Sequence, residues 1–148
     1  MHITTLQALF KRDLEKLKTE IQSYSDEKIL WHTEKSITNS AGNLCLHIIG
    51  NLNAFIGAAL GNSNYVRQRD LEFSLKDVPR SELIQKIDET IATVQNILSN
   101  LSPKDLENQF PIQVSQQKTT TAYFLAHLTT HLSYHLGQIN YHRRLLDE

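Results

Sequence analysis

The sequence has almost no cysteine and almost no net charge, and each shortage excludes a class of protein. Its 148 residues include one cysteine, Cys45, so an intrachain disulfide is excluded and a thiolate-rich zinc site is implausible. The formal net charge of -1 gives no bulk attraction to nucleic acid or to an anionic membrane, so neither partner is expected. The chain also lacks internal repeats, low-complexity tracts and linkers. Its length is that of one domain, and we predict a single domain over residues 1–148.

No secretory leader is visible at the N-terminus. A basic leader followed by an unbroken apolar core is missing, so we expect no signal peptide and a cytoplasmic location. Residues 40–61 are strongly apolar and about as long as a membrane span. They also contain Asn43, His47, Asn51 and Asn53 and lack flanking basic clusters, so a buried bundle helix is the better interpretation.

Four segments show the spacing of amphipathic helices, and strand signals are few. In the first segment the apolar residues recur at steps of three and four: Leu6, Phe10, Leu14, Leu17, Ile21 and Tyr24. The others are predicted at about 39–60, from 79 or 81 to 101, and from 119–121 almost to the end. Ser25 is expected to cap a short turn, and Ser102 followed by Pro103 another. The pattern predicts an all-α fold, a four-helix bundle.

Two connections are longer than a bundle requires. Residues 62–78 join the second and third helices, and residues 108–118 join the third and fourth and could form a small hairpin. Long loops in compact domains are often functional.

Histidines occupy every fourth position of the last predicted helix: His127, His131 and His135. Residues four apart lie on one helical face, so such imidazoles can bind one metal ion. His47 stands in an apolar stretch of the second helix and could add a ligand from a facing helix. The alternative is a polar stripe of partly exposed histidines, and spacing alone does not choose between the pairs His127/His131 and His131/His135.

Polar residues accompany these histidines on both helices. Asn43 and Asn51 lie one turn before and after His47, so they either orient its imidazole or belong to a structural hydrogen-bond network. Gln138 shares a face with His131 and His135 and could hydrogen-bond a ligand or make a bundle contact.

The closing helix, Leu132-Ser-Tyr-His135-Leu-Gly-Gln138-Ile, resembles that of the DinB/YfiT-like metalloenzyme superfamily, whose signature is His, three residues, His, then Gly-Gln-Ile. The segment Asn43-Leu-Cys-Leu-His47-Ile-Ile-Gly-Asn51 resembles that superfamily's second helix. The loop from Arg67 to Phe73 is similar to one of its branches.

The resemblance implies an up-down-down-up bundle, often a homodimer, with a divalent metal ion bound by His47, His131 and His135. His127 falls one turn before the motif and is not a ligand position of that superfamily; an exposed residue is slightly favoured over one that supports a ligand. His2, His32 and His142 are expected at the surface.

Three neutral nitrogen ligands suit Zn²⁺, Ni²⁺ or Fe²⁺, and the sequence does not discriminate among them. Some similar proteins are thiol transferases, so the first hypothesis is a metal-dependent S-transferase that joins a low-molecular-weight thiol to an electrophilic substrate; a hydrolase is also compatible. Arg67 and Arg69 could pair with a carboxylate of the thiol, although solvation or pairing within the chain is the more ordinary role. Asp70 and Glu72 are candidate general bases, with surface ion pairing favoured.

Two other hypotheses remain at this point. The chain could be a non-catalytic metal-binding stress-response protein, or a structural homodimer without metal. Because one fold carries many activities, the fold cannot supply the reaction.

Overall fold

The computed structural model describes residues 2–147, and the regular structure in that range is helical. Four helices are long: α1 (Ile3–Ser23), α2 (Ala41–Leu52), α4 (Arg80–Ser99) and α6 (Thr121–Leu146). The short ones are the 3-10 helix η1 (Glu27–Trp31), the π-helical turn η2 (Asn53–Ala58), α3 (Arg69–Ser74) and α5 (Pro103–Glu107). The all-helical class is therefore as predicted.

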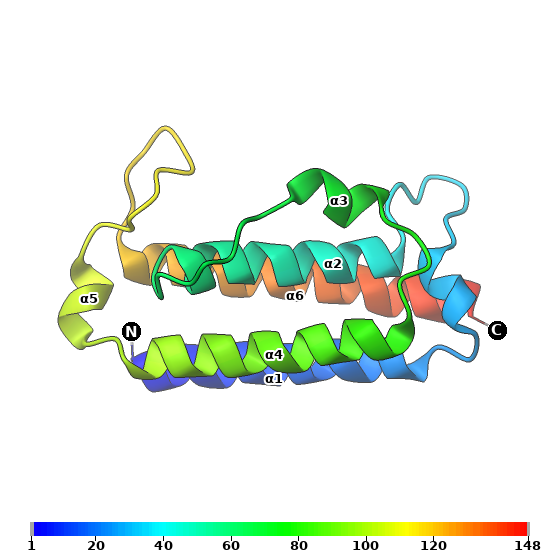
Figure 1. The fold of residues 1–148 in the computed structure, drawn as a ribbon, viewed down its shortest axis with the longest axis horizontal. Helices are drawn as coiled ribbons and strands as arrows, with labels where there is room; N and C mark the ends of the chain where they lie inside the picture. Colours follow the sequence, from blue (N-terminus) through cyan, green and yellow to red (C-terminus); the bar gives the residue numbers. More distant parts are fainter. Residues whose placement is uncertain (1, 148) are drawn as a thin grey trace.

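The long helices form two layers, with α1 beside α4 and α2 beside α6 (Figure 1). Contacts of α2 with α4 and of α1 with α6 join the layers. In Figure 1, α1 and α6 run from left to right, whereas α2 and α4 run from right to left. Helix α3 covers α2 on the side away from α1 and α4.

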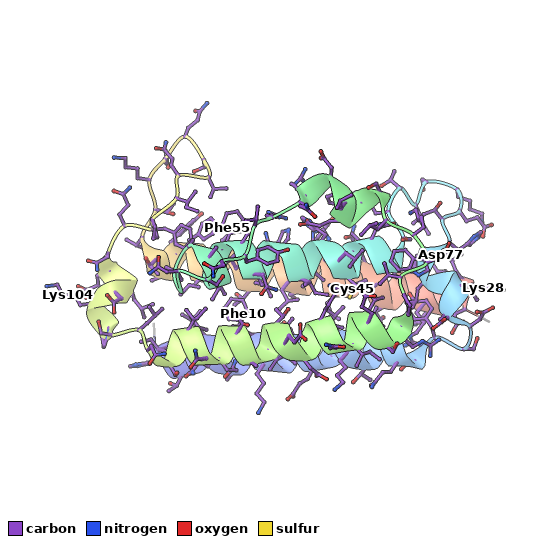
Figure 2. All side chains as sticks on the ribbon, in the orientation of Figure 1. Phe10, Lys28, Cys45, Phe55, Asp77 and Lys104 are labelled. Atoms are coloured by element: carbon purple, nitrogen blue, oxygen red, sulfur yellow. The ribbon has the colours of Figure 1, made fainter. Side chains whose placement is uncertain are left out.

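The core lies between the two layers, and it includes Phe10 of α1 and Cys45 of α2, which are both fully buried (Figure 2). The apolar residues predicted for the first helix are all buried, and five of them have no solvent exposure: Leu6, Phe10, Leu14, Leu17 and Ile21. In α4 the buried face includes Thr90, which is 1% exposed, whereas the neighbouring Ile91 is only half-buried. The Thr90 hydroxyl donates to the carbonyl of Lys86 (2.7 Å) and accepts from Asn53 (3.0 Å), which makes its burial tolerable.

Every residue of α2 is buried, because α4 and α6 pack on it from one side and α3 from the other. This explains why the segment is apolar around its whole circumference. None of the helices described between residues 2 and 147 has the length and apolar character needed to span a bilayer. The prediction of a buried helix in this stretch is confirmed for α2.

Several local predictions need correction. The second helix keeps α-helical geometry only to Leu52 and continues as the π turn η2, and the loop 62–78 contains the unpredicted helix α3. Asp26, not Ser25, caps η1 by accepting from the Lys28 amide; Ser25 instead bonds the Asp147 carboxylate.

The second long loop approaches a hairpin without forming strands. A single antiparallel bridge pairs Gln109 with Thr120, and the Phe110 amide donates to the Thr119 carbonyl (2.9 Å). Before this loop, Ser102 caps α5 and Pro103 begins the helix, as predicted, and Asp105 completes a capping box that was not predicted.

His142 is also not where the sequence placed it. It is buried, at 4% exposure, whereas His2 and His32 are exposed as expected. Its Nε2 donates to the carbonyl of His32 (2.8 Å), so its Nδ1 accepts from the Tyr24 hydroxyl (2.8 Å). This network joins the end of α1 to α6 and makes the burial of a polar ring possible.

Candidate metal site

Three imidazole rings converge between α2 and α6. The Nε2 atom of His131 lies 3.1 Å from Nε2 of His47 and 3.1 Å from Nε2 of His135. One ligand atom from each of the three residues lies within 4.8 Å of the others. The structure thus brings together the residues that the sequence selected, from two helices distant in the chain.

His47 is oriented by an ion pair between Glu72 of α3 and Arg67, which lies two residues before α3. Its Nδ1 lies 3.0 Å from Glu72 Oε1, and because a carboxylate only accepts, Nδ1 carries the proton. Arg67 donates to both oxygens of Glu72, each at 2.9 Å. The carboxylate therefore has both a positive partner and an imidazole donor. The Nε2 lone pair of His47 is left facing the other two rings.

The α3 segment lies close to His47 because α2 leaves room for it at Gly50 and hydrogen-bonds its backbone through Asn43. Gly50 stands one turn after His47, and a Cβ atom there would collide with the Glu72 carboxylate. Asn43 donates from its amide to the carbonyls of Glu72 (3.0 Å) and Leu75 (2.8 Å), which fixes the α3 backbone. The Phe73 ring packs on His47 at 4.9 Å between centroids. These contacts hold the loop over one side of the site.

His135 is oriented by a residue of its own helix. Its Nδ1 lies 2.7 Å from Gln138 Oε1, so Nδ1 donates to the amide oxygen and the Nε2 lone pair points to the cluster. Of the two roles that the sequence left open for Gln138, this contact corresponds to the hydrogen bond with a ligand candidate. His47 and His135 thus have the same tautomer, set in each case by an outer acceptor.

Burial favours the neutral form of His131 and His47. Desolvation, followed by the proximity of His135 and His47, lowers the pKa of His131 to about 4. Desolvation also lowers the pKa of His47, although its hydrogen bond to Glu72 acts in the opposite direction. Imidazole must be unprotonated to bind a metal, so at neutral pH no proton has to be displaced from these two rings.

The donor set fits a divalent cation. His47 and His135 both present lone pairs at Nε2, so only His131 can carry a proton there, and one proton cannot satisfy both 3.1 Å contacts well. A cation between the three nitrogens removes that conflict. Tetrahedral zinc with Zn–N distances of about 2.0–2.1 Å places its nitrogens about 3.4 Å apart, close to the spacing seen here.

The other predicted site residues differ in their exposure and in their contacts. His127 is exposed, with its ring centroid 6.4 Å from that of His131, so it lies beside the cluster rather than in it. Arg69 stacks on Phe73 at 5.2 Å, and Asp70 is exposed. Asn51 is 6% exposed, and its amide oxygen has no hydrogen-bond donor within residues 2–147.

Glu72 requires a correction. The sequence favoured surface pairing, but its side chain is buried, at 6% exposure, and bonds His47 and Arg67. Two residues that support the cluster were not among the predicted site residues: Phe73, which packs on His47, and Gly50, which makes room for Glu72. The glycine inside an apolar helix was the available signal, since such a residue indicates a close approach.

Fold and site together define a helical protein with a partly buried three-histidine cluster that could hold a metal ion. The chain belongs to the family described as "Protein of unknown function (DUF1572)", whose model matches residues 2–148. A search of curated proteins gives no match.

Proposed function

We propose that His47, His131 and His135 bind one divalent metal ion through Nε2 and that the chain is a metal-dependent enzyme of the thiol S-transferase type. The observation that carries the proposal is the mutual approach of three Nε2 atoms, two of which have their Nδ1 protons held by outer acceptors. Zn²⁺, Ni²⁺ and Fe²⁺ all suit three nitrogen donors with a free coordination position.

The metal supplies Lewis acidity, which favours the deprotonated and nucleophilic form of a thiol or of water at neutral pH. In the S-transferase reaction the thiolate sulfur forms a bond to an electrophilic carbon, and the leaving group departs with its electron pair. The protein contributes the binding and orientation of the reactants and the exclusion of water.

The carboxylate nearest the cluster is not free to act as a general base. Glu72 accepts from His47 and from two nitrogens of Arg67, so both of its oxygens are engaged. Asp70, the other candidate, is exposed. The site therefore fits a reaction whose nucleophile is already deprotonated better than a reaction that requires a separate general base.

A relation to the DinB/YfiT-like superfamily supports the proposal. In chain order α1 runs one way, α2 and α4 run the opposite way and α6 runs as α1 does, which suits an up-down-down-up bundle (Figure 1). The His-x-x-x-His spacing of α6 and the histidine of α2 occupy the positions which that resemblance gives to metal ligands. A homodimer is part of the same proposal.

The test is a conjugation assay on metal-loaded protein. A chromogenic aryl halide is incubated with glutathione, bacillithiol, mycothiol or cysteine, and product formation is compared with and without the metal. We expect metal-dependent turnover with at least one thiol, lost in His131→Ala and kept in His127→Ala. Stoichiometric metal binding without turnover for any thiol would contradict the S-transferase assignment and favour a non-catalytic metal-binding protein.

A further inference from the structure

The three histidines of the cluster differ in one respect. His47 has Glu72 as acceptor for its Nδ1 proton, and His135 has Gln138. Within the described residues, His131 forms hydrogen-bond contacts only through Nε2, to the other two rings. Metal-binding histidines almost always donate their second nitrogen to an acceptor, so one outer partner is missing.

An acceptor without a donor lies close by on α2. Asn51 is 94% buried, and its Oδ1 is one of two buried side-chain polar atoms in residues 2–147 without a hydrogen-bond partner. Buried amide oxygens are nearly always paired, so an unpaired one is an exception that needs a cause. The other such atom, Nε of Arg80, belongs to the distant start of α4.

The register of α2 against α6 places Asn51 at the level of His127 and His131. His47 contacts both His131 and His135, with ring centroids 5.0 Å apart in each case. Further along the same helical run, in η2, the ring centroid of Phe55 lies 5.1 Å from that of Phe124. Because the helices run in opposite directions, Asn51, midway between His47 and Phe55, lies at the level of α6 between residues 127 and 131.

His131 Nδ1 and Asn51 Oδ1 form no hydrogen bond in this structure. His47 and His135 both present lone pairs at Nε2, so a contact with them requires the His131 proton to be on Nε2. Its Nδ1 is then a second acceptor and cannot bond Asn51 Oδ1. Metal binding through Nε2 forces the proton of neutral His131 onto Nδ1, which becomes a donor.

We propose that Asn51 is the positioning residue for His131, its Oδ1 accepting the Nδ1 proton when the three Nε2 atoms bind the metal. This inference rests on the proposed metal site. It gives each ligand its own acceptor, namely Glu72, Asn51 and Gln138. The Asn51 amide oxygen then gains a hydrogen-bond donor only when metal binding places the His131 proton on Nδ1.

The test uses the full chain, labelled with ¹⁵N at histidine and loaded with diamagnetic Zn²⁺. We expect three hydrogen-bonded imidazole Nδ1–H resonances from the cluster in the wild type. Asn51→Leu, which has similar size and no acceptor, should lose the resonance of His131 and bind zinc about 10- to 100-fold more weakly. Gln138→Leu is the matched positive control and should lose the resonance of His135 instead. Asn51→Asp, which keeps an oxygen acceptor, should retain all three.

A second measurement checks the unpaired amide in the metal-free protein. Asn51→Leu removes a buried polar group without a partner, so its melting temperature without metal should equal or exceed that of the wild type. A clear decrease would mean that the amide already has a partner, which would overturn the inference.

The outcomes also separate this inference from the proposed function. If wild-type protein does not bind zinc, the metal site itself is wrong. If it binds zinc and Asn51→Leu keeps both the His131 resonance and the wild-type affinity, only the role of Asn51 is wrong. Loss of the His131 resonance in His127→Ala but not in Asn51→Leu would assign the role to His127.

Discussion

The substitution Gly50→Ala tests how the α3 segment supports the site. An alanine Cβ at this position would collide with the Glu72 carboxylate, so the carboxylate must move away from His47 or α2 must shift. Overpacking of this kind costs about 1–3 kcal/mol. The gain in helix propensity offsets about 0.5–1 kcal/mol of that. We expect a net destabilisation of about 1–2 kcal/mol, measured by urea unfolding.

The matched control is Gly137→Ala on α6, where no atom lies within 4 Å of the added Cβ. Propensity alone then acts, and this variant should be more stable than the wild type by about 0.5–1 kcal/mol. Gly50→Ala should also weaken zinc binding about 10- to 100-fold, since His47 loses its oriented acceptor.

A double-mutant cycle with Glu72→Ala locates the origin of the effect. Without the carboxylate the clash is absent, so Gly50→Ala should no longer destabilise the protein in that background. If Gly50→Ala and Gly137→Ala were equally stable and bound zinc like the wild type, the account of how Glu72 reaches His47 would be refuted.

Two further predictions concern parts of the fold outside the site. Burial lowers the pKa of His142 in the folded chain. Above about pH 6.5 the imidazole is neutral in both the folded and the unfolded chain. Below that pH the unfolded chain binds a proton at His142 more readily than the folded chain does. The stability of the folded chain should therefore fall as the pH drops through about 6.5. In thermal melts, the melting temperature of His142→Gln should decrease less between about pH 7.5 and 5.5 than that of the wild type. An equal decrease in both proteins would contradict this. Ser102→Ala removes the cap of α5 and should cost about 1 kcal/mol in urea unfolding, whereas Ser99→Ala, at an exposed helix end, should cost less. Equal costs would mean that the capping box adds nothing.

The sequence was sufficient for the class of fold and for the metal-ligand candidates. Helix periodicity is a local property, and it correctly marked the buried face of α1. The interval of four residues between His131 and His135 fixes their shared face, and the resemblance supplied His47 as the third member. These three rings lie together in the structure.

What surrounds the ligands was harder to predict, because it depends on the path of a loop. Glu72 looks like an ordinary surface acid in the sequence, and only the folding of α3 over Gly50 buries it against His47. His142 was misplaced for a similar reason, since its burial depends on Tyr24 and His32 from remote segments. Local patterns carry no information about such partners.

Metal analysis of the purified protein tests the central claim most directly. The chain is prepared without a nickel column, and its metal content is measured by elemental analysis for the wild type and single alanine variants. The account predicts about one divalent ion per chain, lost in His47→Ala, His131→Ala and His135→Ala and retained in His127→Ala. A wild-type protein that neither contains nor takes up a divalent metal, or a loss in His127→Ala equal to the others, would contradict it.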